Sequence, residues 1–281
     1  MDKSKPNYSI VIPCFNEEKY IAKTLTSLNK QTYDGLIEII VVNNNCSDKT
    51  IAIAKSFGAR IVNESNPGVC WARQAGTKIA KAKVVISTDA DTIYTEDWLK
   101  NIDDMFQRNN NVVAVAGPCK YRDGPWWGNF YTSILFGSAY AYSKLLNRPF
   151  YISATNYAFK KSAWEGYDVK LSQGGDEMAM IGQMKNKGRI VFLLNNPTLT
   201  SARRLNRGLF YNIFVSFFYY YLAGYHLNRI FNRVIIKPAP AYREDSKRLT
   251  IYKKIIALFN ILFSPFQNEK VPESSSRKPK R

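Results

Sequence analysis

Two aspartates one residue apart, Asp89 and Asp91, are the residues whose types and spacing most clearly suggest chemistry. They follow residues 84–88, a run of β-branched and hydroxylic residues that predicts a short buried strand ending at Asp89. In an extended chain, residues two apart project to the same side, and the small Ala90 between them lets a ligand lie close. Converging carboxylates at a strand end suit a hard divalent cation that also binds a diphosphate. An isolated pair of this kind is also compatible with a simple turn carrying two solvated aspartates, so the other segments must decide.

The segments that would position this pair alternate between strands and helices. Apolar runs at 8–13, 37–42, 59–62 and 84–88 predict strands, with Pro13 ending the first, and further strands are expected at 112–116 and 190–194. Apolar residues at helical spacing predict four helices. One begins at Asn16, one passes through Ile51 and stops at Gly58, one covers 69–82 and one begins at Glu96. This order is typical of an α/β protein with a doubly wound, mostly parallel sheet that binds ligands at the carboxyl ends of its strands.

Length and charge limit the class of protein. With 281 residues the chain can bury a full core, as one α/β domain with an appendage. It carries 40 Lys and Arg against 22 Asp and Glu, a formal charge of +18, and residues 229–281 contain 13 basic but only 4 acidic residues. This excess indicates an anionic partner: nucleic acid, an anionic membrane surface or a phosphorylated substrate. The 4 cysteines form no Cys-x-x-Cys pair and the first residues show no secretory signal, so we expect a reducing, cytoplasmic environment.

Two blocks rich in aromatic residues contain no charged side chain. The first, within residues 125–143, predicts either a buried core helix or a surface for a membrane interface or lipid acceptor, and both remain open. The second, residues 209–228, is flanked by arginines and has nearly the length of a membrane-spanning helix. Its polar residues favour a helix lying in the plane of the membrane over one that crosses it.

The end of the chain differs from the α/β region. Apolar residues recur at helical spacing between Ile251 and Leu262 beside two lysines, which predicts a basic amphipathic helix, and the polar residues from 267 on predict disorder. We therefore expect three parts: an α/β domain over 1–207, membrane-associated aromatic and basic amphipathic helices over 208–266, and a disordered basic tail over 267–281.

Several short motifs occur together in a characteristic order. They are VIPCFNE at 11–17, VVNNNCSDKT at 41–50, ARQAG at 72–76, DAD at 89–91, NYAFK at 156–160, GDE at 175–177 and TSARR at 200–204. In this order and spacing the chain resembles the family-2 glycosyltransferases over residues 7–207. The resemblance implies the GT-A fold and transfer of a sugar from a nucleoside-diphosphate-sugar with inversion at the anomeric carbon.

The resemblance also implies roles for single residues. Asp91 is expected to bind Mg²⁺ or Mn²⁺ as the second acid of the metal motif, with Asp89 facing the ribose or sugar of the donor, because a cation neutralises the leaving diphosphate. The other positions expected to contact the donor are Pro13, Phe15, Glu17, Asn43, Asn44, Asp48, Arg73, Ala90, Arg203 and Arg204.

Some of these positions have a second explanation. Asp48 could serve as a helix N-cap, Arg73 could be a solvated helix position, and Arg203 and Arg204 could contact membrane headgroups rather than the diphosphate. Many relatives have an aspartate where this chain has asparagines at 43 and 44, which leaves the preferred nucleobase open.

An inverting transfer needs a carboxylate that accepts the proton of the attacking hydroxyl. In the family this base lies in an acidic pair before a helix, and counting back from Gly188 places Glu177 at its position, with Asp176 as the alternative. The pair could also simply begin a helix, since acidic residues are common in a first turn. The final motif lacks the Gln-x-x-Arg-Trp of processive polymerases, so we expect the addition of a single sugar.

Together these features predict a metal-dependent glycosyltransferase at the cytoplasmic face of the cell membrane, acting on a lipid-linked, glycan or other membrane-proximal acceptor. The alternative is a basic nucleic-acid- or membrane-binding protein without catalysis. Nucleic-acid binding would interleave basic residues with stacking aromatics, whereas the aromatic blocks here are free of charge. We therefore expect an anionic membrane surface rather than nucleic acid as partner.

Overall fold

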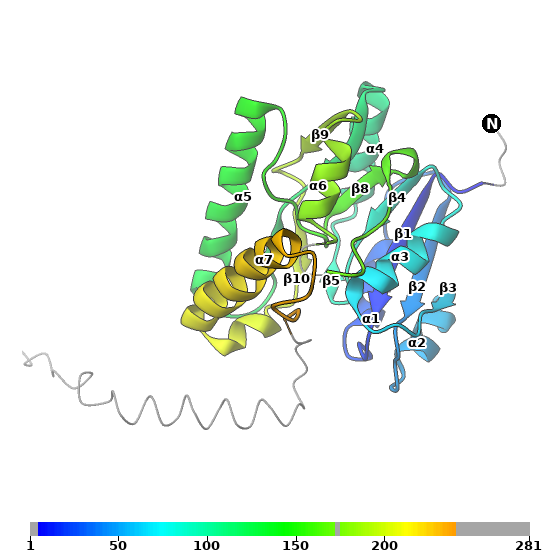
Figure 1. Ribbon diagram of the computed structural model, residues 1–281. Helices are drawn as coiled ribbons and strands as arrows, with labels where there is room; N and C mark the ends of the chain where they lie inside the picture. Colours follow the sequence, from blue (N-terminus) through cyan, green and yellow to red (C-terminus); the bar gives the residue numbers. More distant parts are fainter. Residues whose placement is uncertain (1–4, 172–174, 240–281) are drawn as a thin grey trace, which may run out of the picture. The chain divides into compact units, whose positions relative to one another are not determined.

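A seven-stranded sheet forms the centre of the protein, in a computed structural model that describes residues 5–171 and 175–239. Its strand order is β3-β2-β1-β4-β8-β6-β9 (Figure 1). The parallel half consists of β1 (Tyr8–Cys14), β2 (Ile37–Asn43), β3 (Arg60–Asn63) and β4 (Val84–Ser87). In the other half, β8 (Tyr157–Lys160) runs antiparallel to β4 and β6 (Val112–Ala116), and β6 is parallel to β9 (Arg189–Phe192). The doubly wound, mostly parallel α/β sheet is thus confirmed.

Helices cover both faces of this sheet because the strands are apolar on both sides. On β1, Ile10 and Ile12 pack into one buried cluster and Val11 into the other, as the alternation of side chains along a strand requires. The first cluster is completed by α1 (Ile21–Asn29), α2 (Thr50–Ser56) and α4 (Trp98–Arg108). The second is completed by α3 (Val69–Ile79), α5 (Trp126–Leu146) and α6 (Met178–Met184).

A small second sheet, of order β5-β10-β7, lies next to the end of β4. Its strands are β5 (Thr92–Ile93), β7 (Cys119–Tyr121) and β10 (Thr198–Thr200), and Thr200 pairs with Thr92 directly after the acid pair. The short 3₁₀ helices η1 (Lys161–Ala163) and η2 (Arg203–Arg207) follow β8 and β10. Through this sheet, residues more than a hundred positions after Asp91 are brought beside it.

The predicted strands and helices agree with the structure except at some ends. β1 continues one residue past Pro13, to Cys14. The backbone of Val11 faces β4 and accepts a hydrogen bond from Thr88 N, and Pro13 is the next residue of β1 that faces the same side. Because β4 has already ended there, the missing N–H of Pro13 breaks no hydrogen bond between the two strands. The helix predicted over 69–82 ends at Ile79, since Ala80 is extended.

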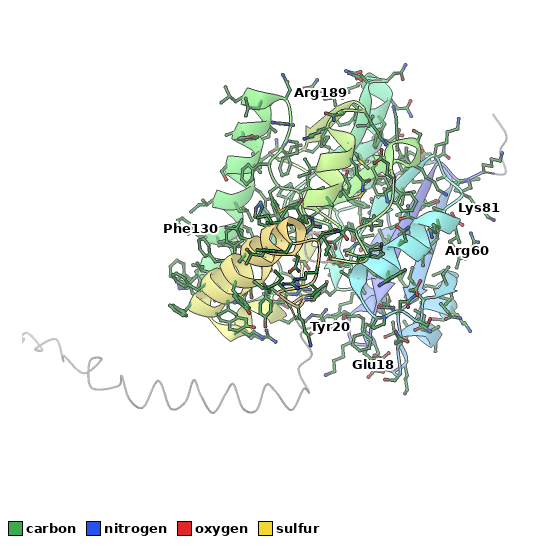
Figure 2. All side chains as sticks on the ribbon, viewed as in Figure 1. Glu18, Tyr20, Arg60, Lys81, Phe130 and Arg189 are labelled. Carbon is green, nitrogen blue, oxygen red and sulfur yellow. The ribbon has the colours of Figure 1, made fainter. Side chains whose placement is uncertain are left out.

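The first aromatic block is a helix with two different faces. Gly128, Thr132, Phe136 and Ala139 of α5 are buried, whereas Trp126, Phe130 and Ile134 are exposed, with 84% of Trp126 open to solvent. Figure 2 shows Phe130 on the outer side of α5. The buried-core alternative therefore holds for one face of this helix only.

The second aromatic block forms η3 (Tyr211–Ala223), a π-helix that continues directly into α7 (Gly224–Ile230). Phe210, Phe214 and Phe218 are exposed on it, while the Tyr221 ring contacts Tyr151 at a centroid distance of 6.0 Å. Within residues 5–171 and 175–239, none of the helices has the length and apolar character needed to cross a membrane. The predicted amphipathic helix at 251–262 and the tail from 267 lie outside the described residues.

Candidate active site

The acid pair lies where β4 ends, at the carboxyl ends of the parallel strands. The carbonyl of Ala90 accepts a hydrogen bond of 2.8 Å from Thr24 Oγ1, which ties the turn to α1. We expected Ala90 to leave room for a ligand, but its side chain is only 3% exposed and packs into the core. Asp89 and Asp91 remain close enough for the charge of Asp89 to raise the pKa of Asp91.

Arg73, on α3, connects Asp89 to the acidic pair that precedes α6. Its Nη2 lies 2.6 Å from Asp89 Oδ1, its Nη1 lies 2.6 Å from Asp176 Oδ2, and its Nε donates to Ser87 Oγ at 2.8 Å. The side chain is only 2% exposed, so the solvated alternative for Arg73 is wrong. A Cβ at Gly76, one turn further along α3, would collide with Val11 and Val42, so glycine is what lets α3 lie this close to β1 and β2. One guanidinium therefore holds the donor-side acid and the candidate base pair together.

Asp91 belongs to a second ion-pair group, built around Arg203 of η2. Arg203 Nη2 lies 2.9 Å from Asp91 Oδ2, and its two Nη atoms donate to the Glu17 carboxylate at 2.7 and 2.8 Å. Thr200 Oγ1 donates to Asp91 at 3.3 Å. Burial raises the pKa of Asp91 to about 6, although the positive charge of Arg203 opposes this. Arg203 thus contacts Asp91, the acid expected to bind the metal directly.

The polar residues after β2 are used largely within the protein. Asn44 donates to the carbonyls of Glu64 and Asn66 at 2.8 and 2.7 Å, and its oxygen accepts from Gly68 N at 2.9 Å. Asn43 likewise donates to Asn63 at 3.0 Å and accepts from Cys46 N at 2.9 Å. Their amide groups therefore position the loop where we expected them to contact the nucleobase.

Asp48 has a clear structural role at the start of α2. It accepts hydrogen bonds from Thr50 N at 3.0 Å and from Glu18 N at 3.1 Å. Burial would raise the pKa of Asp48, but the hydrogen bond that it accepts from the Thr50 hydroxyl, together with those from Thr50 N and Glu18 N, outweighs burial and lowers the pKa. In the loop after β1, by contrast, Phe15 is 39% exposed, and it follows Pro13 at the end of the strand, where a planar base could lie.

The two acids before α6 have different surroundings. Asp176 is paired with Arg73, whereas Glu177 forms no ion pair with any residue that the structure describes. Glu177 Oε1 instead accepts long hydrogen bonds from Tyr151 Oη at 3.4 Å and Ala154 N at 3.3 Å. Burial, and then the negative charge of Asp176, raise the pKa of Glu177 to about 7. A carboxylate with a pKa near neutrality is suited to accept a proton from a hydroxyl group.

The residues at the end of β4 fit a divalent cation that is bound jointly with a substrate. Among residues 5–171 and 175–239, no group of three or more His, Cys, Asp or Glu is arranged to hold a metal. Mg²⁺ and similar ions are usually held by one or two carboxylates together with substrate phosphates, and Asp91 and Asp89 can supply these carboxylates. A cation beside Asp91 would also offset the cost of burying its charge.

Sequence reasoning missed three contributors to this site. Tyr151 follows α5, Tyr221 lies on η3, and Thr200 ends β10, and none of them is near Asp91 or Glu177 in the sequence. Only the unusual glycine inside α3 signalled the close approach that brings Arg73 between the acids. Arg204 is exposed on η2, and its positive charge, like that of Arg203, opposes the rise that burial causes in the pKa of Asp91.

A doubly wound sheet with paired acids at the end of its fourth strand and a carboxylate pair before a later helix is the arrangement of a GT-A glycosyltransferase. Comparison with known proteins agrees. The family model described as Glycosyl transferase family 2 matches residues 9–166, more than half of the chain, and the protein belongs to this family.

Individual relatives are distant and match only in part. Glycosyltransferase GlyG of Streptococcus pneumoniae serotype 4 is 28% identical over 129 residues, 44% of this chain and 42% of that protein. Glucosyl-dolichyl phosphate glucuronosyltransferase of Haloferax volcanii is 28% identical over 116 residues, 39% of this chain and 37% of that protein. The match thus spans less than half the length of these relatives.

A solved structure extends the likeness over nearly the whole chain. Mannosyltransferase PcManGT from Pyrobaculum calidifontis, in complex with GDP-Man and Mn²⁺, has a TM-score of 0.59 to this protein at 17% identity. The superposition covers 94% of this chain and 74% of that one. At this level of identity the likeness shows the GT-A fold.

Proposed function

We propose that this protein is a metal-assisted, inverting glycosyltransferase that moves a single sugar from a nucleoside-diphosphate-sugar to an acceptor hydroxyl. The observation that carries this proposal is Arg73, whose guanidinium contacts Asp89 and Asp176 at 2.6 Å each. A donor at the strand ends and a base before α6 must face each other for an in-line displacement. Arg73 fixes both sides of such a displacement relative to one another.

Each charged group then has a task. Glu177 takes the proton of the acceptor hydroxyl as the oxygen attacks the anomeric carbon, and the bond to the diphosphate breaks on the opposite side. Asp91, with Asp89, would hold Mg²⁺ or Mn²⁺, which supplies positive charge to the leaving diphosphate. Arg203 and Arg204 add cationic groups on the same side, and the fork of Arg203 suits phosphate oxygens as well as the carboxylates that it now binds.

We further propose that the acceptor is lipid-linked or a glycan and that the enzyme works on an anionic membrane at its cytoplasmic face. The exposed apolar residues of α5 and of the helical segment that leads into and includes η3, here called the aromatic face, support this. They are Trp126, Phe130, Ile134, Phe210, Phe214 and Phe218. The start of α5 packs near η2, since a Cβ at Gly128 would collide with Leu205, so both helices begin in the same region (Figure 1). The name of the Haloferax relative, glucosyl-dolichyl phosphate glucuronosyltransferase, also refers to a sugar linked to a lipid phosphate.

The catalytic proposal is tested by incubating the protein with a panel of nucleotide-sugars and Mn²⁺, following donor hydrolysis and the melting temperature. We expect one donor to be hydrolysed and to raise the melting temperature, since ligands that bind the native state stabilise it. Chelation of the metal and the variant Asp91→Asn should each abolish hydrolysis. Hydrolysis that continues unchanged in Asp91→Asn and in EDTA would refute the metal role.

The membrane proposal is tested by sedimentation with vesicles. We expect binding to vesicles containing phosphatidylserine and weaker binding to pure phosphatidylcholine, because the chain carries a net charge of +18. The double variant Phe130→Ser and Phe214→Ser should reduce binding at least tenfold by removing two apolar side chains. Leu36→Ser serves as the matched control, since Leu36 is 53% exposed but lies before β2. Equal loss in the control would contradict the assignment of the aromatic face.

A further inference from the structure

Tyrosines from separate segments surround the carboxylate of Glu177. Tyr151 donates a hydrogen bond of 3.4 Å to Glu177 Oε1, and Tyr221 packs its ring against Tyr151 in an edge-to-face contact with an interplanar angle of 76°. The Tyr221 hydroxyl is shielded from solvent and has no hydrogen-bond partner among the described residues. It lies close enough to Glu177 to oppose the rise that burial causes in the pKa of Glu177. Burial raises the pKa of Tyr131, from α5, and the negative charge of the nearby Glu177 adds to this rise. The base is therefore lined by aromatic rings and neutral hydroxyl groups.

Positive charge near the base is already committed. The guanidinium of Arg73, whose charge acts on Glu177, is shared between Asp89 and Asp176 and is only 2% exposed. The guanidinium of Arg229, on α7, lies 2.6 Å from the Asp168 carboxylate and stacks on the Tyr225 ring. A phosphate group placed against Glu177 would face two carboxylates, those of Asp176 and Glu177, without a guanidinium of its own among the described residues.

We propose that the nucleophile of the acceptor is a neutral hydroxyl of a pyranose ring that packs on Tyr151 and Tyr221, and not the anionic oxygen of a polyprenyl phosphate. This inference rests on the proposed function and names its acceptor class. The apolar C–H face of a pyranose packs against an aromatic ring, while its hydroxyl groups reach the tyrosine hydroxyls. A lipid can still be attached, but beyond the sugar that reacts.

The chemistry of the two acceptor classes differs in its need for a base. A sugar hydroxyl must lose its proton as its oxygen bonds to the anomeric carbon of the donor, and Glu177 accepts that proton while the nucleoside diphosphate departs with the electron pair. A phosphate oxygen is already anionic at neutral pH and requires no base. A carboxylate without a cationic partner, placed among tyrosines, is thus useful for transfer to a sugar hydroxyl and unfavourable for transfer to a phosphate oxygen.

The test compares two acceptor probes with the donor identified by hydrolysis. The probes are a panel of p-nitrophenyl hexopyranosides and farnesyl phosphate, each followed by mass spectrometry of the product. We expect transfer to at least one pyranoside, and we expect Glu177→Gln to slow this transfer and the base-dependent hydrolysis of the donor by at least about 100-fold. Glycosylated farnesyl phosphate, formed at a rate that Glu177→Gln leaves unchanged, would overturn the proposal.

The tyrosines are tested by variants that separate the ring from its hydroxyl. Tyr151→Ala should raise the KM for the pyranoside at least tenfold. Tyr151→Phe should raise it by a smaller factor, because this variant keeps the ring that provides the packing surface and loses only the hydroxyl group. Tyr221→Phe should move the acidic limb of the pH profile to higher pH, since the Tyr221 hydroxyl lowers the pKa of Glu177. Tyr219→Phe, on the exposed side of η3, is the matched control and should change neither quantity.

Two failures can be told apart. If no nucleotide-sugar is bound or hydrolysed, the proposed function itself is wrong. If the donor is hydrolysed in a manner that depends on Glu177 but the alanine and phenylalanine variants of Tyr151 behave alike toward the pyranoside, only the tyrosine surface for the acceptor is refuted.

Discussion

Replacing the proposed base should make the protein more stable while it destroys activity. The change is Glu177→Gln, which keeps the size of the side chain and removes its charge. Burial and the negative charge of Asp176 raise the pKa of Glu177 from 4.5 to about 7 in the folded protein. A carboxyl group whose ionisation is this unfavourable in the native state destabilises the fold at every pH at which the same group in the unfolded chain has already lost its proton.

The size and pH dependence follow from these values. The contribution of Glu177 to stability is most favourable below pH 4.5, becomes less favourable as the pH rises from 4.5 to 7, and carries its full penalty above pH 7. At 1.36 kcal/mol per pKa unit, the penalty at pH 8 is about 3 kcal/mol, and at pH 5.5 about 1 kcal/mol. Because glutamine does not titrate, the variant should gain about these amounts over the parent protein at the two pH values.

Urea unfolding at pH 8 and pH 5.5 measures this gain. Glu165→Gln is the control, since the Glu165 side chain is 61% exposed beside Lys187, and its change should stay within about 0.5 kcal/mol. Asp176→Asn should have the opposite sign to Glu177→Gln, because it removes a buried partner of Arg73. A Glu177→Gln variant that is no more stable than the parent protein at pH 8, or whose gain does not change with pH, would refute the reasoning.

Three further results are expected. In the parent enzyme, kcat/KM should fall about tenfold per pH unit below pH 7, because Glu177 must be ionised to accept a proton, and a flat profile between pH 5.5 and 7 would contradict its role. Arg73→Gln should lower the free energy of unfolding by about 3 to 5 kcal/mol in urea titrations, because it leaves the buried side of Asp176 without its partner. The control Arg60→Gln should lower it by less than about 1 kcal/mol, since Arg60 pairs with Glu38 at the surface, and equal losses would contradict a special role for the Arg73 ion pairs. In Arg203→Gln, 1 mM Mn²⁺ without donor should raise the melting temperature by more than it does in the parent protein, because the variant lacks the guanidinium that competes with the metal for Asp91. An equal rise in both proteins would contradict this competition.

The sequence was sufficient for the α/β fold and for the position of the acid pair. Three strands of the parallel half, β1, β2 and β4, are short and mainly apolar runs, so their existence follows from local pattern alone. The predicted strand at 112–116 matches β6 at both ends. Strand ends shifted where a neighbour decides the outcome, as at Pro13, whose missing N–H is harmless because β4 has already ended.

The contacts of the site were not predictable in the same way. Gly76 indicates that α3 packs closely on the sheet, but nothing in the sequence near residue 73 identifies Asp176 as the partner of its side chain, because that contact joins residues 103 positions apart. Asn43 and Asn44 were predicted to contact the nucleobase from their motif, yet their amides are used by backbone and side-chain partners in neighbouring loops. The choice between Asp176 and Glu177 needed their partners, which only the fold reveals.

The π-helical winding of η3 has a mechanical consequence for how the enzyme meets its surroundings. Tyr221 points toward the base while Phe214 and Phe218 of the same continuous helix face solvent, so a rotation of the helix that reorients one set reorients the other. π-helices are rare, and their hydrogen bonds run from residue i to i+5 instead of i+4, so a local change of winding turns the side chains that follow it. Because Tyr221 and the two phenylalanines share this helix, a change in its winding also changes the angle at which Tyr221 approaches Glu177.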